Sequence, residues 1–205
     1  DLLNPLMPIH WTTVLGMTSI ADGKLPFYQN PNWARGYDIV IHNECWTPDP
    51  SQPFLQQIAA PHKAGIPSMV FHCSLHSYRS AQADDWREFL GVTSRRHTRA
   101  HNITVKWAAD DPITAGLPDF VTPIDELYVI EKVWPGTKAI GTAVNNLDNG
   151  FQGPNEVYPV VWTKEFGAGA RVFGTCSAGA TPCVRSTPAT SWPWHRGSCP
   201  APPSR

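Results

Sequence analysis

The sequence predicts a single α/β domain, and three observations support that fold class. Apolar runs at residues 37–43 and 67–71 have the length and composition of buried strands. Apolar residues at helical spacing lie between the two runs. A strand, a helix and a strand in this order form a right-handed parallel crossover by default. With 205 residues and 41% apolar content, the chain is long enough to bury one sizeable core.

The crossover has recognisable boundaries. Tyr37–Asn43 is preceded by a glycine and followed by a proline-rich turn, which is typical of a central strand leading into a loop. The helix is expected to begin with Ser51 as N-cap and Pro53 in its first turn. Gly65 is expected to end the helix, and the strand at 67–71 follows.

The second half of the chain predicts further short elements. Acidic residues at the start of 84–90 and a glycine after it indicate a short helix. The basic stretch 95–101 is predicted to be a loop, and 111–118 is rich in turn residues. Strands are expected at 103–107, 125–130 and 138–144, and a hairpin at a sheet margin is expected from 157–163 and 171–175.

The last thirty residues follow a different pattern. Residues 182–205 contain six prolines, and no window shows a strand or helix period. We therefore expect a domain over 1–175 and an irregular or disordered tail over 176–205. The tryptophans and cysteines of this tail are unusual for a linker, so an aberrant reading frame is a hypothesis that resequencing would test.

Charge and cysteine content exclude several classes. The net charge is −1 and the basic residues are scattered, so neither nucleic acid nor an anionic membrane surface is an expected partner. No apolar run approaches the length of a membrane span, and we expect a soluble protein of the cytoplasm or periplasm. The five cysteines form no CxxC pair, so no disulfide framework is expected, and Cys45 and Cys73 are interpreted as small buried thiols.

The most informative segment is the one that follows the strand at 67–71. His72, Cys73, His76, Tyr78 and Arg79 lie within eight residues of each other. In open α/β sheets, ligands bind at the carboxyl ends of strands. The sequence therefore predicts a functional site here.

These elements together resemble the ThuA-like (trehalose utilisation) family. The resemblance implies a flavodoxin-like three-layer sandwich with a mostly parallel sheet, of the class I glutamine amidotransferase superfamily, and a role in carbohydrate metabolism. Family members usually have an earlier first strand and a Gly-His-Asn-like loop with a final helix, so the resemblance implies truncation at both ends. The segments that carry the likeness are 37–40, 65–67, His72, 111–118, 125–128, 159–163 and 169–175, and those typical of a bacterial branch are 72–79, 91–97 and 127–135.

Glutaminase activity is not expected from these residues. In amidotransferases of this architecture, a cysteine flanked by glycines occupies the tight turn after the strand. The matching position here is His72, with Cys73 one residue later and no flanking glycines. A β-carbon is poorly suited to such a strained turn. No His-x-Glu pair follows downstream, so the histidine and the acidic residue of a catalytic triad are missing.

A divalent metal such as zinc is a second hypothesis. His72 and His76 are four residues apart, and His97, His101 and Glu44 would complete a ligand set. Zinc would activate a water or polarise a sugar oxygen. The four-residue spacing places both imidazoles on one face only if a helix begins at His72, and loop-bonded histidines are the plain alternative.

A polar carbohydrate pocket is the hypothesis we favour. A sugar presents an apolar ring face and hydroxyl edges, which suit an aromatic surface combined with fixed donors and acceptors. His72 would act as general acid/base. Trp46 or Trp86 would provide the aromatic surface. Each candidate also has a purely structural interpretation: Trp86 would pack in the core, residues 78–79 would form an exposed loop, and residues 95–97 would form a solvated basic turn. The candidate catalytic residues are His72, His97 and Tyr78, and the candidate substrate-binding residues are Arg79, Glu126, His76 and Trp46.

The expected function is therefore to act on or bind a sugar or sugar derivative, as a hydrolase or lyase if the protein is an enzyme. The expected partner is a small-molecule sugar, and the sequence leaves a homo-oligomer open. A non-catalytic carbohydrate-binding or interaction domain, or an inactive fragment, is the alternative.

Overall fold

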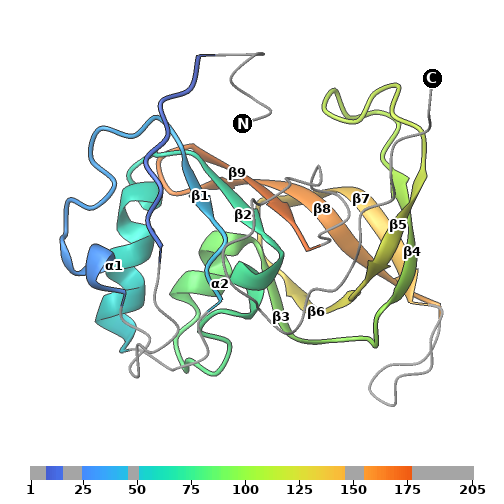
Figure 1. Cartoon of the computed structure of the whole chain (residues 1–205), viewed down its shortest axis with the longest axis horizontal. Coiled ribbons are helices and arrows are strands. Elements are labelled where there is room, and N and C mark those ends of the chain that lie inside the picture. Colours follow the sequence, from blue (N-terminus) through green and yellow to red (C-terminus); the bar gives the residue numbers. More distant parts are fainter. Residues whose placement is uncertain (1–7, 16–24, 46–50, 146–154, 177–205) are drawn as a thin grey trace.

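A computed structural model describes residues 8–15, 25–45, 51–145 and 155–176, and Trp46 and the predicted tail after Cys176 lie outside these ranges. The described part contains a seven-stranded sheet in the order β1-β2-β9-β8-β7-β4-β5 and a two-stranded sheet, β3-β6 (Figure 1). The elements are η1 (Pro26–Gln29), β1 (Val40–His42), α1 (Gln52–Lys63), β2 (Ser68–Phe71), η2 (His72–His76), α2 (Asp85–Leu90), β3 (Val92–His97), β4 (His101–Trp107), β5 (Phe120–Asp125), β6 (Tyr128–Val133), β7 (Thr137–Asn145), β8 (Glu156–Phe166) and β9 (Ala170–Thr175).

The chain has an α/β fold, and its large sheet is mixed. β1 pairs with β2 and β2 with β9 in parallel. The other pairs of the large sheet are antiparallel. A flavodoxin-like sandwich with a mostly parallel sheet is therefore not confirmed. The predicted hairpin is present as β8 and β9, but it lies in the middle of the sheet rather than at its margin, because β9 also pairs with β2.

The helices gather beside the parallel strands, whereas β4, β5 and β7 lie at the other end of the molecule (Figure 1). α1 begins after Ser51, contains Pro53 in its first turn, and buries Phe54, Leu55, Ile58 and Ala59, as its spacing predicts. α2 buries Trp86, Phe89 and Leu90 and ends at Gly91, whose φ of 95° requires a residue without a β-carbon. The predicted parallel crossover from β1 through α1 to β2 is confirmed.

Two predicted segments differ from the structure. The supposed basic loop at 95–101 contains the end of β3, and its polar residues pair with β6 in the small sheet. The strand predicted at 125–130 is divided: Asp125 ends β5, and Tyr128 begins β6. The two residues at 126–127 belong to no strand and join β5 of the large sheet to β6 of the small sheet.

The centre of the sheet is held by a buried indole. Trp162 on β8 is fully buried and donates a hydrogen bond from Nε1 to the Leu90 carbonyl at 2.8 Å. Its ring lies against Gly174 on β9, where a β-carbon would clash with the indole. These contacts fix α2 relative to the strand pair β8-β9. In the part of the chain that the structure describes, none of the helices has the length and apolar character needed to cross a membrane.

Candidate functional site

His72 occupies a strained turn at the carboxyl end of β2. Its φ is 26°, in the left-handed region that residues with a β-carbon rarely adopt. The chain passes directly from β2 into the 3-10 helix η2 at this residue. A β-carbon in such a turn was not expected from the sequence, yet the structure places one there. Backbone strain of this kind costs about 1–3 kcal/mol and concentrates at functional sites.

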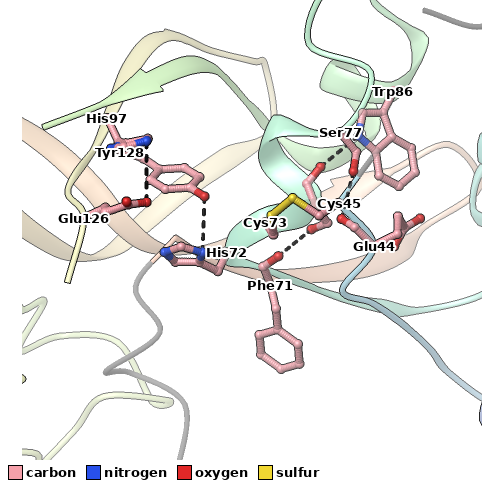
Figure 2. Close-up of a disulfide and its surroundings, with 11 residues drawn as sticks. Glu44, Cys45, Phe71, His72, Cys73, Ser77, Trp86, His97, Glu126 and Tyr128 are labelled. Carbon is pink, nitrogen blue, oxygen red and sulfur yellow. Dashed lines mark hydrogen bonds and ion pairs between the residues drawn. A yellow bond between two sulfur atoms is a disulfide. The ribbon is translucent and has the colours of Figure 1, made fainter. Parts of the chain in front are cut away.

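The His72 imidazole lies beside the Tyr128 phenol (Figure 2) and near the Asp125 carboxylate. Its Nδ1 is 3.2 Å from the Tyr128 hydroxyl, and its Nε2 is 3.4 Å from Asp125 Oδ1. Burial raises the pKa of Tyr128, so the phenol keeps its proton and can donate to Nδ1. The Nε2 atom is buried and makes no hydrogen bond within the described part of the chain, although its distance from Asp125 allows an ion pair with the protonated ring.

Tyr128 also packs on His76, with ring centroids 3.8 Å apart and planes 5° from parallel. The Ser94 hydroxyl donates to the Arg96 carbonyl, so it accepts a hydrogen bond from His76 Nε2, 3.0 Å away. Burial, followed by the charges of His97, Arg79 and His72, lowers the pKa of His76 to about 3. His76 is therefore a neutral ring that orients its neighbours.

His97 and Glu126 form the exposed side of this group. His97 Nε2 is 3.5 Å from Glu126 Oε2, and the two side chains are 37% and 39% exposed. The other ring nitrogen, Nδ1, donates to the Thr98 carbonyl at 2.7 Å. The structure thus brings together six residues from η2, β3, β5, β6 and the link between β5 and β6, which we call the histidine cluster: His72, His76, His97, Asp125, Glu126 and Tyr128.

A disulfide joins the carboxyl ends of β1 and β2, which corrects the interpretation of Cys45 and Cys73 as thiols. The two cysteines are 28 residues apart in sequence, with Cα atoms separated by 5.1 Å. The parallel pairing of β1 with β2 brings them together, and the spacing of the cysteines alone did not reveal it. In Figure 2 the disulfide separates the side chains of the histidine cluster from Glu44, Ser77 and Trp86.

A second, buried network lies beyond the disulfide. His62 Nδ1 donates to the Ile66 carbonyl at 2.8 Å, so its Nε2 accepts from His42 Nε2 at 3.0 Å. His42 Nδ1 is 3.0 Å from Glu44 Oε1, which is within hydrogen-bond distance. Burial and the charge of His42 lower the pKa of His62 to about 3. Burial raises the pKa of Glu44, but His42 and hydrogen bonds outweigh it, so the net pKa is lowered.

The remaining predicted site residues lie in different places. Tyr78 is completely buried and packs edge-on against Trp86, away from any surface that a sugar could reach. Trp86 is itself a core residue and donates to the Ser74 carbonyl at 3.1 Å. Arg79 lines a hollow together with Arg87 and Arg95. Trp46 lies outside the described residues.

The geometry of the described residues gives no metal site. No three His, Cys, Asp or Glu side chains among them are placed to hold one ion. His72 and His76 lie on a 3-10 helix, where residues four apart do not share a face. His101 Nδ1 is bonded to the Arg99 carbonyl, and Glu44 belongs to the buried network.

The cysteines near the turn after β2 offer no thiolate nucleophile among the described residues. His72 occupies the turn itself, and Cys73 is bonded to Cys45 rather than present as a thiolate. Cys176 is a free cysteine among the described residues, but burial raises its pKa to about 12. Sequence reasoning did not assign Tyr128, Asp125 or Ser94 to the site. The polar residues 125, 126 and 128 beside an apolar strand were the available signal.

Comparison with known proteins places this arrangement in a family. The chain matches the ThuA family, described as trehalose utilisation, over residues 26–189. The chain belongs to the ThuA family. That match covers all the described strands, the strained turn at His72 and the histidine cluster. A comparison with curated protein sequences finds no match.

Two crystal structures show the same ThuA-like fold. A ThuA-like protein of Bacteroides uniformis aligns with a TM-score of 0.58 and 15% identity over 74% of this chain and 65% of that one. A ThuA-like protein of Parabacteroides merdae aligns with a TM-score of 0.54 and 17% identity over 68% of this chain and 59% of that one. The aligned part of the chain thus spans somewhat less than two thirds of the length of these relatives.

Proposed function

We propose that this ThuA-like protein acts on or binds a sugar or sugar derivative at the histidine cluster. The proposal rests on the state of His72: a strained backbone at a strand end, a phenol on Nδ1, and a buried Nε2 that makes no hydrogen bond with any described residue and lies 3.4 Å from Asp125 Oδ1. A buried polar atom that makes no hydrogen bond requires an explanation, and a ligand hydroxyl would supply that bond beside the longer contact with Asp125. The family's description as trehalose utilisation supports a sugar as that ligand.

Each residue of the cluster has a role in this proposal. His72 transfers a proton as general acid/base, because an imidazole can accept a proton on one ring nitrogen and donate one from the other. Asp125 stabilises the protonated form of His72, and Tyr128 orients the ring. His97 and Glu126 are the most exposed members and hydrogen-bond sugar hydroxyls. Tyr78 has no part in the proposal, because its ring is buried in the core.

The disulfide supports a proposed compartment. Disulfides persist in oxidising surroundings and are rare in the cytoplasm of most organisms. The Cys45–Cys73 bond therefore favours the periplasm over the cytoplasm.

The test uses the purified protein with trehalose, glucose and their 3-keto derivatives. Calorimetry measures binding, and mass spectrometry measures turnover. We expect His72→Gln to lose binding or turnover by at least about tenfold. The matched control is His10→Gln, since His10 is an exposed histidine outside the cluster. Binding without any product favours a non-catalytic sugar-binding domain, and an unchanged His72→Gln variant refutes the proposal.

A further inference from the structure

A hollow of about 480 Å³ opens next to the histidine cluster. Its polar lining comes from the segment after η2 and from α2 and β3, and consists of Arg79, Ser80, Gln82, Asp84, Arg87 and Arg95. Arg79 lies three residues after His76, and its charge lowers the pKa values of both His76 and Tyr128. Arg95 follows Ser94, which bonds His76. The Arg79 side chain of the hollow therefore lies close to the histidine cluster.

The lining carries more positive than negative charge. Three guanidinium groups face one carboxylate, and that carboxylate, Asp84, accepts a hydrogen bond from Arg87 Nε at 2.7 Å. Arg95 is paired with Glu131 at 2.5 Å. The Arg79 guanidinium makes no hydrogen bond or ion pair with any described residue, and Arg79 is partly buried. The hollow thus contains one positive charge, that of Arg79, with which no described carboxylate forms an ion pair.

Hydrogen bonds to its backbone carbonyls hold the segment that contains Arg79 in place. The Arg87 guanidinium is 2% exposed and donates to the carbonyls of Arg79, Ala81 and Ala83 at 3.3, 2.8 and 2.8 Å. Arg95 Nε donates to the same Arg79 carbonyl at 3.1 Å. Two arginines therefore fix the backbone that presents the side chains of Arg79, Ser80 and Gln82. A site organised before binding loses less conformational entropy when a ligand arrives.

We propose that this hollow binds an oxyanion, the phosphate or carboxylate group of an acidic sugar derivative. A free guanidinium offers a planar fork of donors that matches both groups. The Ser80 hydroxyl and the Gln82 amide add neutral donors to the same lining. The volume lies within the range of small-molecule sites, so it accommodates the charged group while the sugar ring reaches the cluster. The sugar part of this inference rests on the proposed function, whereas the anion part does not.

The experiment measures binding of glucose, glucose 6-phosphate, gluconate and inorganic phosphate by calorimetry. We expect at least one charged sugar to bind more tightly than glucose, by about tenfold or more, as charge-assisted bonds require. Glucose 6-phosphate and gluconate distinguish a phosphate from a carboxylate. Arg79→Gln should remove the preference, and Arg79→Lys should restore it only in part, because an ammonium lacks the fork. Arg171→Gln is the matched control, since Arg171 is exposed on β9.

The two proposals fail in distinguishable ways. If His72→Gln leaves sugar binding unchanged while Arg79→Gln abolishes phosphate binding, the proposed function is wrong and the anion site stands. If Arg79→Gln, with an unchanged melting temperature, binds glucose 6-phosphate, gluconate and phosphate as the parent does, the anion site is wrong. Equal affinity of the parent protein for glucose and both charged sugars also overturns it, as does a complete lack of anion binding.

Discussion

The ring of Tyr128 stacks on the ring of His76 at a centroid distance of 3.8 Å, and the same phenol reaches His72 Nδ1 at 3.2 Å. One aromatic side chain therefore connects a neutral, buried histidine with the histidine at the strand end. The stack fixes the plane of the phenol, and the hydroxyl then fixes the orientation of the His72 imidazole. The site depends on this contact between η2 and β6, which are far apart in the sequence.

Tyr128→Phe removes the hydroxyl and leaves the stack. We expect the variant to fold and to lose about 1 kcal/mol of stability, the usual value of one hydrogen bond. Turnover or binding of a sugar should fall by roughly tenfold, because His72 loses the group that orients it. Tyr158→Phe is the control, since Tyr158 donates to Glu156 outside the cluster. Sugar kinetics that are the same in both variants would show that the phenol does not orient His72.

Stability should fall as the pH is lowered through the range below 6.5. His62 and His76 have pKa values lowered from the ordinary 6.5 to about 3. Between pH 6.5 and pH 3 the unfolded chain binds protons that the folded chain does not. The contribution of these two histidines to the free energy of unfolding is therefore complete above pH 6.5 and is lost toward pH 3. The expected slope approaches about 1.4 kcal/mol per pH unit for each histidine.

Urea unfolding at pH 7.5, 6.5, 5.5 and 5.0 measures this slope before most carboxylates titrate. His76→Phe keeps a ring on Tyr128 and removes one titrating group, so its slope should be about half that of the parent. A free energy of unfolding that is constant between pH 7.5 and 5.0 would contradict the burial of both histidines.

The disulfide should be detectable directly by peptide mapping. Trypsin cleaves after Arg35, Lys63 and Arg79, so digestion without reductant should release a peptide of residues 36–63 joined to one of residues 64–79. Closing a loop of this length stabilises a fold by roughly 2–4 kcal/mol in the chain-entropy account. The double variant Cys45→Ala/Cys73→Ala should unfold at correspondingly lower urea. Separate, alkylated peptides from protein purified without reductant would contradict the bond.

Gly174 should tolerate no larger residue. A β-carbon there would clash with the buried Trp162 indole in the centre of the sheet. Gly174→Ala should therefore cost about 1–3 kcal/mol or prevent folding. Gly36→Ala is the comparison, because its β-carbon would meet no atom within 4 Å and tests only the effect of positive φ. Thermal melting measures both, and an equal shift in the two variants would argue against the clash.

The sequence predicted the elements around β2 well, because their signals are local. The N-cap position of Ser51, the glycine after α1 and the apolar run of β2 each indicate one boundary without reference to the rest of the chain. The same local reasoning placed His72 at a strand end. It also brought His76, His97 and Glu126 into one candidate set, which the structure groups around Tyr128.

What the sequence could not show depends on contacts between distant segments. The direction of β7 and β8 relative to β2 is fixed by pairing across the sheet, and β3 was missed because its polar residues pair with β6 in a small sheet. Tyr78 looked accessible because polar residues flank it, but its ring lies in the core beside Trp86. The disulfide and the unpaired Arg79 likewise became visible only in three dimensions.

The imidazole ¹⁵N spectrum of His72 during titration with trehalose and glucose 6-phosphate tests most directly whether a sugar ligand binds at the histidine cluster. We predict that the His72 nitrogens shift with saturating dependence on at least one of these ligands, while those of the buried His62 do not. A ligand that binds without changing the His72 signals, or that shifts only residues outside the histidine cluster and the hollow, would contradict the account.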